Sequence, residues 1–274
     1  MQRKDTKGGI LHYNVGSQLK YYTELRIMIE SMAKDVVSQI LELFKKPFSK
    51  KFFKSVTAND ESISSQARIK LNALTKKYEK LFASKAKKIS ESMVFNQQKL
   101  SQFNVKKSVE KVYPDVVIKG NLVTPDMEDI MRASIEANVE LINSVPSNYM
   151  KDITGEVMRA ITTGYGEQDI RLALEKYEGI SKRKAKEIAQ DQMRKAYTAA
   201  NIQNIKELGM NKFCWVHSGG GQFPRESHVK MDGMIFSLDG AELIKEQAKL
   251  GVKPKDQGFP GYPVNCGCIM QAVH

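Results

Sequence analysis

The sequence predicts an α+β fold, with a mostly α-helical N-terminal two thirds and a small mixed α/β C-terminal domain of about three short strands. Three observations support this fold class. Apolar residues recur at three- and four-residue steps as far as residue 208, which is the period of amphipathic helices. After Gly209 the pattern changes to short segments rich in β-branched and aromatic residues, separated by glycine and proline. This last part of the chain also holds all three cysteines and the only tryptophan.

Two long helices are expected in the first part of the chain. Residues 17–46 carry one apolar stripe, and Pro47 cannot continue the helix because its ring removes a hydrogen-bond donor and clashes with the preceding turn. A second stripe runs from Leu71 to Met93. Two helices with one stripe each can bury both stripes by packing as an antiparallel hairpin.

Shorter helices with clear start and stop signals are expected next. Residues 103–123 are weakly patterned, and we place a domain boundary at Gly120. Thr124 is a good N-cap, followed by proline at the first helical position and an acid in the first turn. The expected helices cover residues 127–143, 149–163, 169–177 and 182–208, with breaks at Pro146, Gly164 and Gly179 and a stop at Gly209.

The C-terminal region has a different pattern. Residues 213–217, 234–237 and 266–273 are expected to form strands, and residues 239–250 a short helix. The predicted organisation is therefore a basic long-helix region over residues 1–119, a compact helical region over residues 120–209, and a small α+β domain over residues 210–274.

Positive charge is concentrated in the N-terminal part. The net charge is +12, and residues 1–120 hold 24 Lys and Arg against 11 Asp and Glu. This asymmetry favours contact with a polyanion, either nucleic acid or an acidic protein surface; the alternative is a solvated lysine-rich helix face. Because lysine dominates, we expect any contact with double-stranded DNA to be non-specific and salt-sensitive. The candidate contact residues are Lys76, Lys77, Lys80, Lys87 and Lys88.

The sequence also indicates in which cellular compartment the protein is expected. No apolar stretch approaches the roughly 18 residues that span a bilayer, so no membrane partner is expected. The first residues are not followed by the apolar segment of a secretory signal, so we expect the protein to begin in a cytoplasm. Three cysteines cannot build a disulfide framework, which leaves free thiols or a metal site.

Cysteine and histidine residues of the last region suggest two arrangements. His228, Cys266 and Cys268 could bind zinc, with Cys214, His217 or His274 as the fourth ligand. The Cys-x-Cys spacing is unusual for structural zinc, and both sulfurs on one face of a strand equally suit core packing. The favoured expectation is a metal-free, hydrogen-bonded cluster with no cofactor, in which Arg225 and His228 bond backbone carbonyls or Asp232. Zinc is the alternative.

Catalytic motifs are weak, and we expect a protein that is not an enzyme. His228, Asn265 and His274 loosely resemble a ββα-metal nuclease site, but that fold needs a helix after the asparagine, and the sequence predicts a strand there. Glycines 219–221 do not form a phosphate-binding loop, because no Lys-Ser/Thr pair follows them. A metal-dependent nucleic-acid-acting enzyme and a zinc-stabilised DNA-binding module remain as alternatives.

Several motifs in order carry a family resemblance. Trp215 lies on an expected strand, followed by Arg-Glu-Ser-His at 225–228, Met-Asp-Gly-Met-Ile-Phe at 231–236, and Asn-Cys-Gly-Cys at 265–268. Upstream, residues 180–191 have the form Ile-Ser-Lys-Arg-Lys-Ala-Lys-Glu-Ile-Ala-Gln-Asp. With these elements, residues 120–274 resemble the phage Mu protein F-like family of minor head proteins, also called head morphogenesis proteins. Gly267 departs from the family's Asn-Cys-Arg-Cys pattern.

The resemblance implies a minor head (capsid) structural protein of a tailed bacteriophage or prophage. Such a protein acts in head morphogenesis at the portal vertex and contacts or accompanies DNA during packaging or ejection. The implied partners are the portal protein, the major capsid or scaffold proteins, and double-stranded DNA. The implied location is the virion, inside the head, with the host cytoplasm during assembly. The motif residues are expected to stabilise the small domain rather than perform chemistry: Trp215, Arg225, His228, Asp232, Gly233, Asn265, Cys266 and Cys268.

Overall fold

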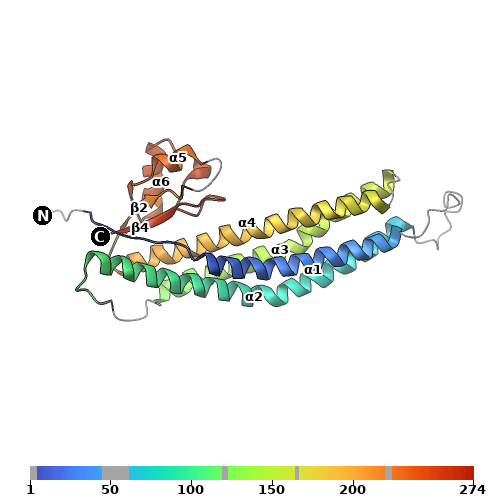
Figure 1. The fold of residues 1–274 in the computed structure, drawn as a ribbon, viewed down its shortest axis with the longest axis horizontal. Coiled ribbons are helices and arrows are strands. Elements are labelled where there is room, and N and C mark those ends of the chain that lie inside the picture. The colour runs from blue at the N-terminus through green and yellow to red at the C-terminus, as the bar shows by residue number, and fades with distance from the viewer. Residues whose placement is uncertain (1–4, 45–61, 119–122, 164–166, 220–223) are drawn as a thin grey trace. The chain divides into compact units, whose positions relative to one another are not determined.

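A computed structural model describes residues 5–44, 62–118, 123–163, 167–219 and 224–274 (Figure 1). Long helices and one small antiparallel sheet confirm the α+β fold class. The elements in chain order are β1 (Lys7–Ile10), α1 (Val15–Phe44), α2 (Ile63–Val112), α3 (Pro125–Thr163), α4 (Glu167–Glu207), β2 (Lys212–Val216), α5 (Glu226–Lys230), β3 (Ile235–Ser237), α6 (Gly240–Lys249), a 3₁₀ turn (Pro254–Asp256) and β4 (Ile269–Val273).

The predicted helix breaks at Pro146 and Gly179 are wrong. Helix α3 continues through Pro146, which is buried, and helix α4 continues through Gly179. The hydroxyls of Ser144 and Ser147 donate to the carbonyls of Leu141 and Ser144, and so supply donors beside the proline. A glycine inside a helix costs only about 1 kcal/mol relative to alanine, which a long packed helix tolerates.

Helix α2 extends well beyond the predicted apolar stripe. It ends at Val112, although residues 103–123 are only weakly patterned in the sequence. The stripe ends near Met93 because the next buried side chains are largely polar, so the hydrophobic pattern disappears while the helix continues. The buried polar residues are Gln97, Gln98, Ser101 and Ser108, and the buried apolar residues among them are Val94, Val105 and Val109.

The chain packs into two compact units that are each discontinuous in sequence. Unit 1 comprises residues 1–21, 90–136 and 187–274, and unit 2 comprises residues 22–89 and 137–186. Helices α1, α2, α3 and α4 each contribute residues to both units. The three consecutive regions expected from the sequence therefore differ from this grouping. Pro47, Gly120, Gly164 and glycines 220 and 221, all used in the sequence argument, lie outside the described residues.

Unit 2 is built from helix segments that pack through their apolar residues and are joined by ion pairs and hydrogen bonds. Lys77 Nζ lies 2.6 Å from Asp35 Oδ2, and Lys70 Nζ lies 3.3 Å from Glu42 Oε2, so α1 and α2 run side by side in opposite directions. Tyr177 on α4 donates to Glu156 on α3 at 3.1 Å. The buried residues Met32, Val36, Leu74 and Phe82 are part of the core of this unit.

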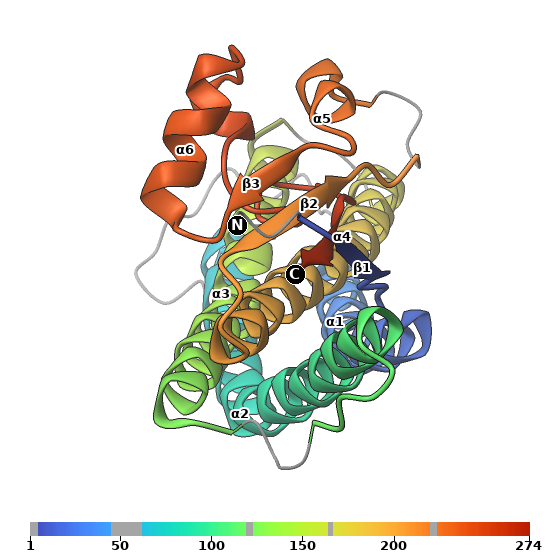
Figure 2. The ribbon, with the colours of Figure 1, turned by 90° about the vertical axis from the view of Figure 1, so that its left-hand side faces the viewer.

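Unit 1 contains the sheet, whose strand order is β1-β4-β2-β3 with every pairing antiparallel. The last three strands correspond to the predicted ones, but β1 was not predicted. Residues 7–10 pair with β4, so a strand from the start of the chain forms one edge of the C-terminal sheet (Figure 2). Helix α6 lies beside β3, at the other edge.

Close approach of Ser108 and His274 explains the glycines of β1. A Cβ atom on Gly8 would lie 2.3 Å from Ser108 Oγ and 2.6 Å from His274 Nε2. The backbone N–H of Gly9 donates to Ser108 Oγ at 2.8 Å. Strand β1 is therefore fixed to helix α2 as well as to β4.

Capping predictions hold at two of the helices. The N–H of Met127 donates to Thr124 Oγ1 at 3.2 Å at the start of α3, and Gly209 has a φ of 75° after α4. No helix in the described part of the chain combines the length and apolar composition required to cross a bilayer.

Candidate functional site

Three predicted ligand residues of unit 1 meet in the interior. His228, Cys266 and Cys268 are buried, and their Nδ1 and Sγ atoms all lie within 4.8 Å of one another. His228 Nδ1 is 3.5 Å from the sulfur of Cys266 and 3.7 Å from that of Cys268. The cluster brings together a Cys-x-Cys motif and a histidine 38 residues earlier in the chain.

The cysteines do not lie on a strand as predicted. Strand β4 begins at Ile269, and both cysteines precede it in a loop. Asn265 has a φ of 58°, the left-handed conformation that asparagine tolerates better than most residues, and it turns the chain before Cys266. The N–H of Cys266 donates to the carbonyl of Pro263 at 2.8 Å. The turn, rather than strand alternation, therefore presents both sulfurs to His228.

His228 is positioned by the short helix α5 and by the tryptophan of β2. The indole of Trp215 is fully buried and packs edge-on against the imidazole, with ring centroids 5.1 Å apart. The turn after α5 requires Gly233, whose φ is 76° and whose N–H donates to the Trp215 carbonyl at 2.8 Å. Asp232 accepts the N–H of His217 at 2.8 Å. The Met-Asp-Gly motif thus fixes α5 against β2.

Arg225 links three parts of the site. Its Nε lies 2.7 Å from Asp256 Oδ1, and its Nη2 donates to the carbonyl of Val264 at 2.7 Å. The carbonyl of Asp256 lies 3.0 Å from His228 Nε2, so this nitrogen is the donor. The expected bonds from Arg225 and His228 to backbone carbonyls are present, and Asp256 rather than Asp232 is the charged partner of Arg225.

Burial and mutual contacts shift the titration of the cluster. Hydrogen bonds with Cys268, with His228 and with the N–H of Gly261 lower the pKa of Cys266, against the opposing effect of burial. The hydrogen bond to Cys266, together with burial, raises the pKa of Cys268. Burial opposes protonation of His228, but Cys266 and the Asp256 carbonyl outweigh it and raise its pKa. The two sulfurs therefore differ, with Cys266 the more acidic.

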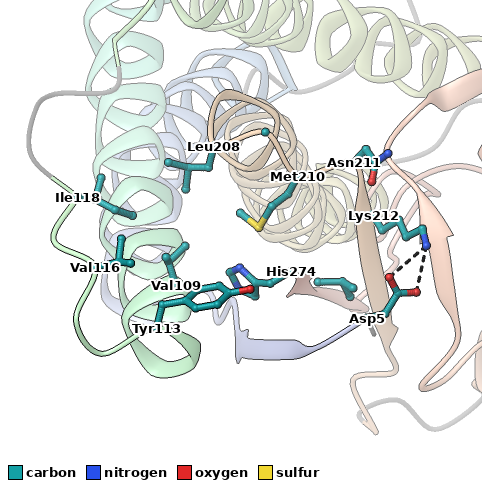
Figure 3. A pocket seen from close by; sticks show the side chains of 12 residues that line it. Asp5, Val109, Tyr113, Val116, Ile118, Leu208, Met210, Asn211, Lys212 and His274 are labelled. Carbon is teal, nitrogen blue, oxygen red and sulfur yellow. Dashed lines mark hydrogen bonds and ion pairs between the residues drawn. The ribbon is translucent and has the colours of Figure 1, made fainter. Parts of the chain in front are cut away.

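The other proposed ligands lie outside the cluster. Cys214 is buried on β2, where its sulfur contacts the carbonyl of Trp215 at 3.6 Å. His217 is half-buried, and its Nδ1 accepts the N–H of Gly219 at 3.2 Å. His274 packs edge-on against Tyr113, with centroids 5.7 Å apart, in a separate cavity of about 360 Å³ (Figure 3). Within the described residues, none of the three joins the group.

The cavity lined by Tyr113 and His274 lies between the end of α2, the end of α4 and the sheet. Val109, Val116 and Met210 give it an apolar lining, and an ion pair between Lys212 and Asp5 at 3.0 Å lies at its margin (Figure 3). Burial lowers the pKa of His274 in its wall. The cavity provides no second cluster of metal-binding side chains in the described part of the chain.

Sequence reasoning missed several residues around the cysteines. Tyr13 donates to the carbonyl of Cys268 at 2.8 Å, and Arg194 Nη1 donates to the carbonyl of Cys266 at 3.3 Å. Gly261 N–H faces the sulfur of Cys266 at 3.4 Å. A lone acid within a Pro/Gly-rich loop was a usable signal for Asp256, whereas Tyr13 reaches the site only because β1 joins the sheet.

The candidate polyanion-binding lysines belong to helix α2 within unit 2, and all five are exposed. Lys77 is paired with Asp35, and Lys87 also takes part in an interaction. Lys76, Lys80 and Lys88 complete the set.

A comparison with known families adds to this geometry. Residues 151–271 match the family model described as "Phage Mu protein F like protein". This part of the chain is similar to the phage Mu protein F-like family. The matched range includes Trp215, the Arg225–His228 motif and both cysteines of the cluster. The resemblance stated from the sequence motifs is thereby confirmed.

Two curated relatives are similar to the chain over about half its length. One is an "Uncharacterized protein" of Haemophilus influenzae, 27% identical over 150 residues, covering 55% of this chain and 31% of the relative. The other is the "Uncharacterized protein YqbB" of Bacillus subtilis, 25% identical over 169 residues, covering 54% of this chain and 55% of the relative. The chain thus matches about a third and about half of their lengths. No solved structure matches.

Proposed function

We propose that the protein is a minor head protein of a tailed bacteriophage or prophage that acts in head morphogenesis at the portal vertex. The observation that carries this proposal is the phage Mu protein F-like match over residues 151–271. The portal protein and the major capsid or scaffold proteins are the proposed partners. The virion is the proposed location, with the host cytoplasm during assembly.

The geometry of the motif residues supports a structural rather than a catalytic role. His228 and both cysteines have relative exposures of 2% or less, so a macromolecular substrate has no direct access to them. His228 contacts the carbonyl of Asp256 and the ring of Trp215, and the carboxylate of Asp256 is in turn paired with Arg225. Such an arrangement fixes a loop and a short helix, which a rigid module for protein contacts requires.

A metal-dependent nuclease is less well supported. A ββα-metal site places its last ligand on a helix after the asparagine, but Ile269–Val273 is a strand. His274 follows that strand and lines the separate cavity with Tyr113.

The basic face of α2 is proposed to contact DNA inside the head. Exposed lysines neutralise phosphates without reading bases, and this suits a protein that meets packaged DNA of any sequence. These lysines lie within residues 1–120, which hold 24 Lys and Arg against 11 Asp and Glu. This segment therefore accounts for the net positive charge of the chain.

Quantitative mass spectrometry of purified particles tests the proposal. Particles of the phage or induced prophage that encodes the chain should contain a few copies each. Comparison of DNA-filled with emptied heads then shows whether the protein leaves with the DNA. Absence from both kinds of particle, with normal heads formed by a deletion strain, would contradict a role as a head component.

A further inference from the structure

The three side chains of the Cys/His cluster present the donor set of a zinc site. Thiolate sulfur and imidazole nitrogen are the ligands that zinc prefers in proteins. Zn–S bonds of about 2.3 Å and a Zn–N bond of about 2.0 Å at the tetrahedral angle place sulfur and nitrogen about 3.5 Å apart. The observed separations from His228 Nδ1 to the two sulfurs are 3.5 and 3.7 Å.

The tautomer of His228 also suits a metal. Its Nε2 faces the carbonyl of Asp256 at 3.0 Å, and because a carbonyl only accepts, Nε2 must carry the proton. In the neutral ring, Nδ1 then has a free lone pair that is directed at Cys266 and Cys268. Metal-binding histidines commonly donate their other N–H to a carbonyl or carboxylate in this way.

Further contacts hold the ligands in place. Arg225 fixes Asp256 through its carboxylate at 2.7 Å and fixes the loop before Cys266 through the Val264 carbonyl. Tyr13 bonds the carbonyl of Cys268, and the N–H of Gly261 faces the sulfur of Cys266. Residues from separate segments of unit 1 therefore hold the two sulfurs and the imidazole close to one another.

A hydrogen-bonded cluster without metal explains this arrangement less completely. One N–H or one lone pair points along a line to a single partner, whereas Nδ1 is nearly equidistant from both sulfurs. A cation between the three atoms would interact with all of them at once.

We propose that His228 Nδ1, Cys266 Sγ and Cys268 Sγ bind one zinc ion that stabilises the sheet-containing unit. Among the described residues no fourth His, Cys, Asp or Glu joins the group, so the fourth position is assigned to a water molecule. The site cross-links helix α5 to the loop that leads into β4. This inference is independent of the proposed role in the phage head.

Metal analysis of the full chain tests the site. The protein is purified under reducing conditions without chelator, and its zinc content is measured by mass spectrometry of the metal. We expect about one zinc per chain, and a fall of about 10 °C in Tm when a strong chelator removes it. Replacement of zinc by cobalt should give an absorption band from thiolate-to-cobalt charge transfer.

Matched variants assign the ligands. Cys266→Ser and Cys268→Ser should each lower the zinc content at least tenfold, whereas Cys214→Ser, which alters a buried cysteine outside the cluster, should retain it. If the ligand variants do not fold, the wild-type zinc content and cobalt spectrum decide alone.

Two results would overturn the proposal. The first is wild-type protein that holds less than about 0.1 zinc per chain, even after incubation with zinc and dialysis, with a Tm unaffected by chelator. The second is zinc content that survives both cysteine substitutions or is lost in folded Cys214→Ser, which would place the metal elsewhere.

Discussion

Arg225 shows at the scale of one residue why this position needs a guanidinium. Its Nε and Nη2 reach an Asp256 carboxylate oxygen and the Val264 carbonyl, each at 2.7 Å. A planar fork of fixed donors can serve two acceptors from different segments, which a lysine ammonium on a flexible stem does poorly. The side chain is about one third exposed, so it stabilises the fold more by positioning the two segments than through its charge.

Arg225→Lys should therefore lower the free energy of unfolding by about 1–2 kcal/mol, because one hydrogen bond to the loop is lost. Urea unfolding of the full chain, with the zinc concentration fixed, measures the difference. Lys255→Gln changes an exposed neighbour and should stay within about 0.5 kcal/mol of the wild type. Equal stability of Arg225→Lys and the wild type would show that the fork is dispensable.

Some residues of the candidate site could be predicted from the sequence, and others could not. The motif order drew attention to His228, Cys266 and Cys268, and the structure brings these three together. Tyr13 could not be found, since its contact with Cys268 spans 255 positions in the chain and depends on a strand with no sequence signal. The spacing of Cys266 and Cys268 suggested a strand, but the positive φ at Asn265 and the loop override that pattern.

At the scale of elements, helices α1 and α2 meet around Asp35. Its carboxylate accepts from Lys77 at 2.6 Å, from Tyr78 at 2.9 Å and from Gln39 at 2.7 Å. Partial burial alone would raise the pKa of Asp35, but these hydrogen bonds outweigh burial and lower it. The charged carboxylate therefore stabilises the helix pair.

Because the folded pKa of Asp35 is depressed, its contribution is present above the unfolded value near 3.8 and is lost as the pH falls through the folded value. Asp35→Asn should cost about 1–2 kcal/mol at pH 7, and the gap from the wild type should shrink below about pH 4. Chemical unfolding of the variant and of the wild type at several pH values measures this difference in the free energy of unfolding.

Glu42→Gln is the matched control, since its pair with Lys70 is largely exposed and should be worth less than about 0.5 kcal/mol. A gap between Asp35→Asn and the wild type that stays constant down to pH 3 would exclude the charge as its origin.

The boundaries of the helices and strands show where prediction from local sequence patterns fails. Caps were predictable, as at Thr124, because they depend on neighbouring residues. The continuations through Pro146 and along α2 past Met93 were not, because tertiary packing and buried polar side chains maintain helices that local signals would end. Strand β1 is only four residues long and holds two glycines, so alternation could not reveal it.

On the scale of the whole molecule, charge is the feature most open to test. The excess of basic residues lies before residue 121, and it includes the exposed lysines of α2. Non-specific DNA binding by such a surface depends on the number of phosphates neutralised, and counterion release makes it weaken steeply with salt.

Replacement of Lys76, Lys80 and Lys88 by glutamine should weaken binding to duplex DNA of any sequence at least about tenfold at moderate salt. The slope of log affinity against log salt should become shallower by about 3, at about 0.9 per lost phosphate contact. Fluorescence anisotropy over a salt series gives both values.

A control with the same change in charge replaces Lys230, Lys245 and Lys249, which are exposed on α5 and α6. If both triple variants lose affinity equally, total charge rather than the α2 surface governs binding.

The pairing of β1 with β4 has a consequence for how the chain matures. Gln271 donates to the carbonyl of Gly8, 263 positions away. At 5–20 residues per second, the ribosome needs roughly 10–50 s to make the intervening segment. Strand β4 lies between β1 and β2, so the sheet cannot grow beyond the β2–β3 pair until residues 269–273 emerge. Throughout synthesis, β1 lacks its strand partner, and the long helices must be made before its backbone donors and acceptors can pair with those of β4.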